Sequence, residues 1–178
     1  MYNRFIEVFV SGVLILVGIA TYHFCFQPKT GYILIQEVYN NFDFKKEMEK
    51  KFLATKNARQ KKLDSLEMMV NSLGNKIGRM PEKERNSDEI AKFHELQEEY
   101  QKRKRADEED NSELSAEYDR EILTQLNQYI KDYGTQNNYT YIFGNDGNGS
   151  LMFAIERRNI SNDVIEYVNK KYSGQIVK

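Results

Sequence analysis

The sequence has little of the residue types from which metal sites and covalent active sites are usually built. Its 178 residues include one cysteine, two histidines and no tryptophan. The single Cys25 excludes an internal disulfide and any zinc site made of cysteines. His23 and His94 lie far apart in the sequence, so nothing indicates a metal centre or a nucleophile paired with a base. We therefore predict no cofactor, no metal site and no catalytic residue, and we do not expect an enzyme.

An excess of charge of one sign is also missing. Lysine and arginine number 26 and aspartate and glutamate 27, which gives a net charge of −1 although 30% of the residues are charged. A balanced chain has no overall field that would attract nucleic acid or an acidic substrate, so charge can act only locally. The composition therefore predicts no nucleic-acid partner.

The N-terminal segment Val8–Phe26 contains no Asp, Glu, Lys or Arg. As a helix it would be about 28 Å long, close to the thickness of a bilayer core, so residues 8–26 can anchor the chain in the inner membrane. The same segment fits a cleaved signal peptide, with Arg4 before the apolar stretch and a cleavage site after Ala20. We assign residues 1–28 to one of these two roles, with the anchor preferred. Both roles place the remainder of the chain across the membrane.

A long central region has the composition of helices. Residues 37–133 contain one proline, Pro81, and two glycines, while Lys, Glu, Leu, Gln, Met and Arg dominate. We predict two long helices within residues 37–134, separated by a break from Gly78 to Asn86. Each helix, at roughly 45 residues, would be on the order of 65 Å long.

Apolar residues on both sides of this break recur at intervals of three and four. That spacing is typical of a coiled-coil seam, so we expect the two helices to pack together. Residues 54–62 and 101–113 have almost no apolar side chains beyond alanine, and their centres, 58 and 107, average to 82.5, inside the break. These segments would face each other in an antiparallel hairpin, where the helices could bow apart. The seam residues are Leu63, Leu66, Val70, Leu73, Ile77 and Met80 in the first helix and Ile90, Phe93, Leu96 and Tyr100 in the second.

Charge along the two helices independently predicts the same hairpin. Residues 45–62 contain eight Lys or Arg against two Glu, a net charge of +6, and residues 107–121 contain one Arg against eight Asp or Glu, a net charge of −7. An antiparallel arrangement places these two blocks side by side. Each exposed ion pair contributes only about a few tenths of a kcal/mol, so the pattern selects the orientation more than it stabilises the fold.

Two short apolar runs near the C-terminus have the composition of strands. Tyr139–Phe143 and Leu151–Ile155 are rich in aromatic and β-branched residues and are predicted to form a β-hairpin. Gly144, Gly147 and Gly149 lie between them and can take positive φ in the turn.

The loop between these runs also has some features of a calcium site. Asp146, Asn148 and Ser150 alternate as the first ligands of an EF-hand loop do. That loop needs Gly at its sixth position and Glu at its twelfth, where this chain has Leu151 and Arg157. The sequence therefore favours a turn over a calcium site.

A further strand and a short helix complete the predicted fold. We expect a strand at Tyr32–Gln36 and a helix capped by Ser161 or Asn162, with Val164, Ile165, Val168 and Tyr172 along one side. The predicted fold class is α+β, a long antiparallel helical hairpin on a small β-sheet body, after an N-terminal transmembrane or signal segment. The body would consist of residues 31–36 and 139–178. Three short strands make a poor core alone, so we expect self-association.

Three segments in a fixed order carry a resemblance to a known family. "GYILIQEVYNNF" leads into the lysine- and glutamate-rich hairpin, and "YTYIFGNDGNGSLMFA" and "ISNDVIEYVNKKY" follow it. This order, over about residues 30–172, resembles the Skp/OmpH family of periplasmic chaperones. The resemblance implies that residues 29–178 form one Skp/OmpH-like domain and that the chain is a homotrimer, with a small β body and helical tentacles around a cavity. It also implies an ATP-independent holdase for unfolded outer-membrane β-barrel proteins.

The resemblance further implies roles for apolar residues of the hairpin and of the body. Flexible methionine side chains suit a surface that binds many clients. The alternative is a membrane-anchored coiled-coil scaffold of an envelope complex, whose arms bind one fixed partner. The client-binding candidates are Met48, Phe52, Met68, Met69, Phe93 and Tyr100, and the oligomerisation candidates are Ile33, Ile35, Tyr141, Phe143 and Met152.

Overall fold

The computed structural model of the chain describes residues 12–19, 22 and 27–175. The chain divides into two compact units, one formed by the residues up to Val38 and by Ile130–Val164, the other by Tyr39–Tyr129 and the residues from Ile165 on. Most described residues are helical. The elements in chain order are β1 (Thr30–Leu34), α2 (Ile35–Asn41), α3 (Asp43–Arg79), η1 (Glu82–Glu84), α4 (Ser87–Gln136), β2 (Tyr141–Asn145), η2 (Glu156–Arg158) and α5 (Ser161–Tyr172).

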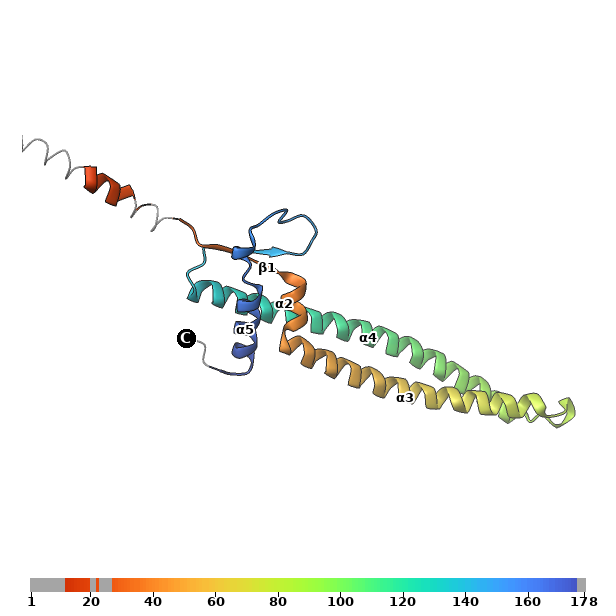
Figure 1. The fold of residues 1–178 in the computed structure, drawn as a ribbon. Helices are drawn as coiled ribbons and strands as arrows, with labels where there is room; N and C mark the ends of the chain where they lie inside the picture. The colour runs from red at the N-terminus through yellow and green to blue at the C-terminus, as the bar shows by residue number, and fades with distance from the viewer. Residues whose placement is uncertain (1–11, 20–21, 23–26, 176–178) are drawn as a thin grey trace, which may run out of the picture. The chain divides into compact units, whose positions relative to one another are not determined.

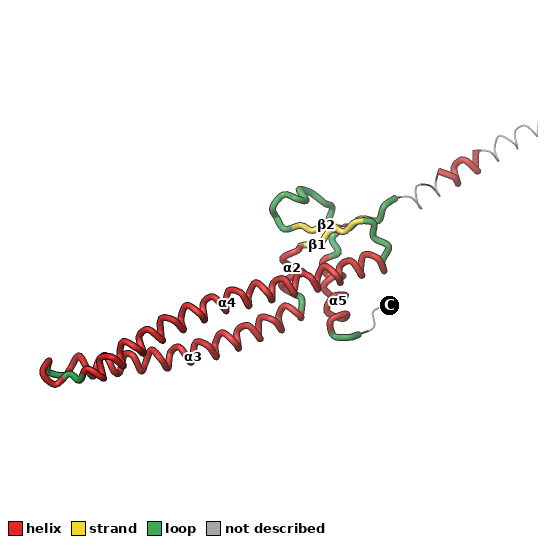
Figure 2. The backbone as a smooth tube through the Cα atoms, turned by 180° about the vertical axis from the view of Figure 1, so that it is seen from behind, coloured by secondary structure: helices red, strands yellow, loops and turns green. Residues whose placement is uncertain are grey.

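The second unit contains the predicted antiparallel hairpin. Helices α3 and α4 run side by side in opposite directions and meet at a tight connection (Figures 1 and 2). The connection contains Pro81 and the short turn η1, because proline cannot continue a helix. The side-chain oxygen of Asn86 accepts a hydrogen bond of 2.9 Å from the backbone N–H of Asp88, which caps the start of α4. The predicted break is therefore confirmed, although it begins at Met80, because Gly78 and Arg79 still belong to α3.

Apolar residues fill the seam at both ends of the hairpin. Met48, Ile122 and Leu126 are buried in the half of the hairpin farther from the connection. Near the connection, a Cβ atom on Gly74 would lie 2.9 Å from the ring of Phe93, so the glycine lets the two helices approach closely.

Polar groups occupy the middle of the hairpin, as the seam-poor segments predicted. Arg59 forms an ion pair of 3.2 Å with Asp110 and donates a hydrogen bond of 2.7 Å to the side-chain oxygen of Asn111. Asp107 is buried, and its Oδ1 lies 3.1 Å from Nε of Arg103, whereas its buried Oδ2 has no hydrogen-bond partner. We call Arg59, Arg103, Asp107, Asp110 and Asn111 the polar layer.

The predicted charge complementarity is only partly expressed as ion pairs between the helices. Lys76 and Glu89, whose residue numbers average to the predicted 82.5, form an ion pair across the hairpin. In contrast, Lys45 pairs with Glu49 within α3, and Lys51 pairs with Glu47 in the same way. The antiparallel orientation is confirmed, but these lysines reach the nearer carboxylates four residues away along their own helix.

An aromatic cluster packs α5 against the start of α3 within the second unit. Phe42, in the break between α2 and α3, is fully buried. Its ring centroid lies 6.1 Å from those of Tyr129 and Tyr172 and 5.9 Å from that of Phe44. Such edge-to-face pairs add about 0.5–1.5 kcal/mol each beyond the area that they bury.

The first unit contains a two-stranded parallel sheet instead of the predicted β-hairpin (Figure 2). Strand β2 pairs with β1 in a register that runs from Thr30 opposite Tyr141 to Leu34 opposite Asn145. The predicted second strand, Leu151–Ile155, is not a strand. The prediction of the hairpin was therefore wrong, and so was that of three strands.

The backbone around the loop explains this difference. Gly147 and Gly149 take the positive φ that was expected of them, and Asn145 and Asp146 accept hydrogen bonds from backbone N–H groups two residues on, so the chain forms a wide loop. On the far side of β1, the N–H of Ile160 donates to the carbonyl of Tyr32 at 2.9 Å. The chain that follows the loop thus takes the second edge of β1.

The first strand and the last helix also differ in detail from the prediction. The strand predicted at Tyr32–Gln36 lies two residues earlier, and α2 already begins at Ile35. A Cβ atom on Gly144 would lie 2.5 Å from Cδ1 of Ile35, so a larger residue there would require the Ile35 side chain to move. The cap of α5 was expected at Ser161 or Asn162, but the N–H of Ser161 donates to Oδ1 of Asn159. The Ser161 hydroxyl instead accepts from the Leu34 N–H.

The N-terminal prediction is tested only in part. Of the segment 8–26, residues 8–11, 20–21 and 23–26 lie outside the described residues, and residues 12–19 are helical. In the part of the chain that the structure describes, no helix is long and apolar enough to cross a membrane.

Candidate functional site

Two exposed methionines lie in the half of the hairpin nearer the connection between α3 and α4. Met68 and Met69 of α3 are 72% and 56% exposed, and Leu53 is exposed on the same helix. The two methionines lie among exposed polar residues, both charged and uncharged: Asp64, Ser65, Glu67, Asn71, Ser72, Asn75 and Lys76. Methionine side chains are flexible and polarisable, so they can pack against apolar groups of different shapes.

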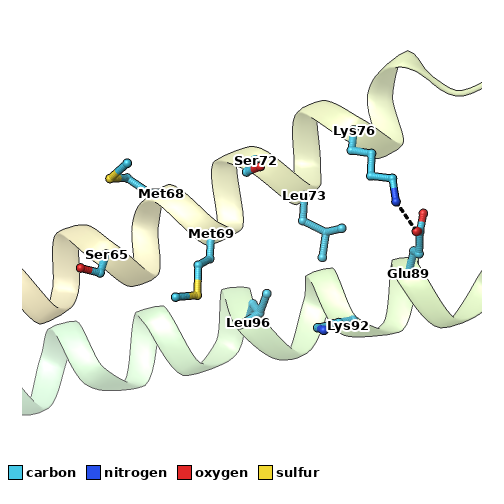
Figure 3. Close-up of a pocket in the computed structure, with 9 residues that line it drawn as sticks. All are labelled: Ser65, Met68, Met69, Ser72, Leu73, Lys76, Glu89, Lys92 and Leu96. Carbon is cyan, nitrogen blue, oxygen red and sulfur yellow. Dashed lines mark hydrogen bonds and ion pairs between the residues drawn. The ribbon is translucent and has the colours of Figure 1, made fainter.

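A groove of about 760 Å³ runs between α3 and α4 beside these methionines (Figure 3). Met69 and Leu73 point toward α4, where Leu96 faces them, whereas Met68, which also lines the groove, points away from α4 (Figure 3). The ion pair of Lys76 with Glu89 lies nearer the connection. The residues that line the groove are Ser65, Met68, Met69, Ser72, Leu73, Lys76, Glu89, Lys92 and Leu96.

Among the residues that line this groove, Glu89 has a buried side-chain oxygen without a hydrogen-bond partner. Its Oε1 accepts a hydrogen bond from Nζ of Lys76, while its Oε2 is buried without a hydrogen-bond partner. A buried carboxylate oxygen without a donor is unfavourable by about 1–3 kcal/mol or more, so a donor that reaches it would be bound favourably. Sequence reasoning missed Glu89, because one more acid in a charge-rich helix gives no distinguishing signal.

The other four client-binding candidates lie closer to the seam. Met48 is buried, at 5% exposed, whereas Phe52, Phe93 and Tyr100 are half-buried. Met48 and Phe52 line a smaller cavity of about 210 Å³ together with Tyr39. Of the six candidates, the two adjacent methionines are thus the most available to a partner.

Two tyrosine hydroxyls donate hydrogen bonds to carboxylates in the half of the hairpin where this smaller cavity lies. The Tyr39 hydroxyl donates to Oδ1 of Asp119 at 3.0 Å, and burial together with this bond raises the pKa of Tyr39 to about 12. The Tyr172 hydroxyl donates to Glu47, and this bond, aided by burial, raises the pKa of Tyr172 to about 12. Both hydroxyls therefore stay protonated and act as donors at neutral pH.

A second group of exposed apolar residues lies in the first unit. Tyr141 and Phe143 are exposed on one face of β2, with ring centroids 6.0 Å apart. Met152 and Phe153, in the loop after β2, are 87% and 82% exposed. We call these four residues the body patch.

Most of the predicted oligomerisation residues belong to this patch. Tyr141, Phe143 and Met152 are exposed, whereas Ile33 is buried and Ile35 is half-buried within the chain. Phe153 was missed, because a strand would have placed neighbouring side chains on opposite faces. Since no strand forms there, the adjacent side chains of Met152 and Phe153 are both exposed.

The described residues offer no group of three or more His, Cys, Asp or Glu that could hold a metal ion. In the loop after β2, Asp146 accepts hydrogen bonds from the backbone and the side chain of Asn148, and these lower the pKa of Asp146. The carboxylate thus serves a local turn.

Comparison with known proteins agrees with this architecture. The family described as outer membrane protein (OmpH-like) matches residues 29–168. Among solved structures, the fold is similar to the crystal structure of a candidate outer membrane chaperone (OmpH-like) from Caulobacter crescentus CB15, with a TM-score of 0.53 and 9% sequence identity over 85% of this chain and 89% of the other. No curated protein matches the chain. Because the family match takes in most of its length, the chain belongs to the OmpH-like family.

Proposed function

We propose that the protein is an ATP-independent holdase chaperone that keeps unfolded outer-membrane β-barrel proteins soluble in the periplasm. The family and the fold support a chaperone role, and OmpH-like proteins are not an enzyme family. The observation that carries the proposal is the exposure of Met68 and Met69 on a long hairpin whose other exposed residues are mostly polar. An exposed apolar group in such a surface is typical of a site for another protein.

The chemistry of the hairpin fits weak binding of many clients. A fully buried methionine contributes about 1.5–3 kcal/mol, and a partly covered one less, so single contacts form and break readily. Several contacts at once would hold an unfolded chain, while charges of both signs on the same helices would keep the complex soluble. Release then needs no ATP, because folding of the client removes its apolar residues from the hairpin.

We further propose that the body patch joins three copies of the chain. Tyr141 and Phe143 lie on β2, which pairs with β1 along one edge and with no other described strand. An exposed strand edge beside exposed apolar residues favours association with another chain. Three copies joined in this way could surround an enclosed space with their hairpins, in which a client would be held.

The proposal also includes the location of the protein in the periplasm. A periplasmic holdase needs export, and residues 8–26 would supply it, either as a signal peptide or as an anchor in the inner membrane. Arg4 before the segment favours a cytoplasmic N-terminus.

An aggregation assay tests the proposed function. Several unrelated β-barrel proteins are diluted from denaturant with and without the full chain, and light scattering is followed. We expect the chain to suppress aggregation of all of them near a stoichiometric ratio. If aggregation is unchanged, and pull-down instead yields one dominant partner, the protein is a scaffold and the holdase proposal is wrong.

A further inference from the structure

The groove between α3 and α4 combines an apolar floor with a polar end. Met69, Leu73 and Leu96 form the floor (Figure 3). Lys76 and Glu89, already paired with each other, and Lys92 form the polar end. The volume of about 760 Å³ lies within the range of about 300–1,000 Å³ that is usual for binding sites.

The polar end indicates which backbone conformation an occupant would have. Oε2 of Glu89 lacks a donor, and rotation about the terminal bond of a glutamate side chain is soft, so this oxygen can turn toward the groove. In a helical occupant, the backbone N–H groups away from the ends are already bonded within the helix. An extended occupant keeps its N–H and C=O groups free. The unmet acceptor therefore favours an extended segment.

The floor indicates the side-chain pattern of the occupant. In an extended segment, alternate side chains point to opposite sides, so every second residue would face Met69, Leu73 and Leu96. The residues between them would face water, beside the charged surface of the hairpin. Strands of membrane β-barrels alternate apolar and polar residues in this way.

We propose that this groove binds an extended segment of alternating apolar and polar residues, with a backbone N–H of the segment donating to Glu89. The inference rests on the proposed holdase function and assigns it one defined subsite on each hairpin. Lys92, at the same end of the groove, supplies a donor for a backbone carbonyl of the segment.

Synthetic peptides test the backbone contact. Binding of a labelled ten-residue peptide of alternating leucine and serine to the full chain is measured by fluorescence anisotropy. The same peptide with N-methyl groups on alternate backbone nitrogens lacks half of its donors. We expect it to bind about tenfold more weakly, as for the loss of a hydrogen bond to a charged acceptor. Equal affinity of the two peptides would overturn the backbone contact.

Two exposed apolar residues of α3, Leu53 and Met69, provide a matched pair of variants. Met69→Asp places a charge on the groove floor, whereas Leu53→Asp introduces the same charge at an exposed residue of α3 that does not line the groove. Both lie in exposed turns of α3, so both should retain the wild-type helix content. We expect Met69→Asp to bind the unmethylated peptide about tenfold more weakly and Leu53→Asp to bind as the wild type does. Equal losses in both variants would contradict the groove.

The aggregation assay is run on the same wild-type sample. The wild type could suppress aggregation while methylation of the peptide and the Met69→Asp change both leave peptide binding unaltered. In that case the groove proposal fails and the holdase proposal stands. If the wild type does not suppress aggregation, the proposed function fails, whatever the peptides show.

Discussion

The side-chain amide of Asn169, in α5, binds the ends of two other helices. Its Nδ2 donates to the carbonyl of Asn41, the last residue of α2, at 3.0 Å. Its Oδ1 accepts from the N–H of Asp43, the first residue of α3, at 2.8 Å. Phe42 lies between these two residues and has no side-chain group that could cap α3 itself. Asn169 therefore supplies, from a distant part of the sequence, the cap that α3 lacks.

Replacing this amide tests its contribution to stability. Asn169→Ala removes both hydrogen bonds, and we expect it to lower the free energy of unfolding by about 1–2 kcal/mol. The measurement is thermal unfolding at a fixed protein concentration, because assembly makes the melting temperature depend on concentration. Asn162→Ala, at an exposed position of α5, is the control. Equal melting temperatures of the two variants would show that Asn169 has no special role.

For single residues, the sequence indicates which side chains are exposed better than it indicates their hydrogen-bond partners. Met68 and Met69 could be predicted as surface candidates, because each helix has only one seam and they fall outside it. The bonds of Asn169 could not be predicted, since they join positions more than a hundred residues apart. Glu89 is a similar case, because its unmet oxygen depends on how α3 and α4 pack.

Among the elements, the hairpin follows from local signals. Pro81 ends α3 wherever the helix packs, and blocks of opposite charge oppose a parallel or shifted arrangement. The sheet does not follow from local signals, because β1 and β2 are separated by the whole hairpin. A glycine-rich loop between two apolar runs is compatible with a β-hairpin turn and with a wide loop. Only the pairing of Tyr32 with Ile160 decides between them.

The polar layer in the middle of the hairpin has a testable consequence. Asp107→Leu removes a buried carboxylate with an unpartnered oxygen and extends the apolar seam. We expect it to stabilise the hairpin by about 1–3 kcal/mol and to slow amide hydrogen exchange across residues 101–113.

Asp110→Leu is the control for this prediction. It lies in the same layer, but the Asp110 side chain is exposed and its ion pair with Arg59 contributes less than about 1 kcal/mol. This variant should leave stability and exchange nearly unchanged or slightly lower the stability. If Asp107→Leu destabilises the protein as much as Asp110→Leu does, the layer is not a weak point of the seam.

For the whole molecule, the proposed function depends on assembly. One hairpin can offer a groove, but an enclosed space for an unfolded chain requires several. The body patch is the surface from which we infer assembly, and Phe143→Asp together with Met152→Asp would place two charges on it. Both side chains are exposed in the single chain, so the variant should fold and fail to assemble.

Sedimentation equilibrium of the full chain tests this account most directly. We predict a species of three 21.0 kDa chains for the wild type and single chains for the variant with Phe143→Asp and Met152→Asp. A wild type that stays a monomer at all concentrations measured would contradict the enclosed space, and with it the proposed mode of holding clients.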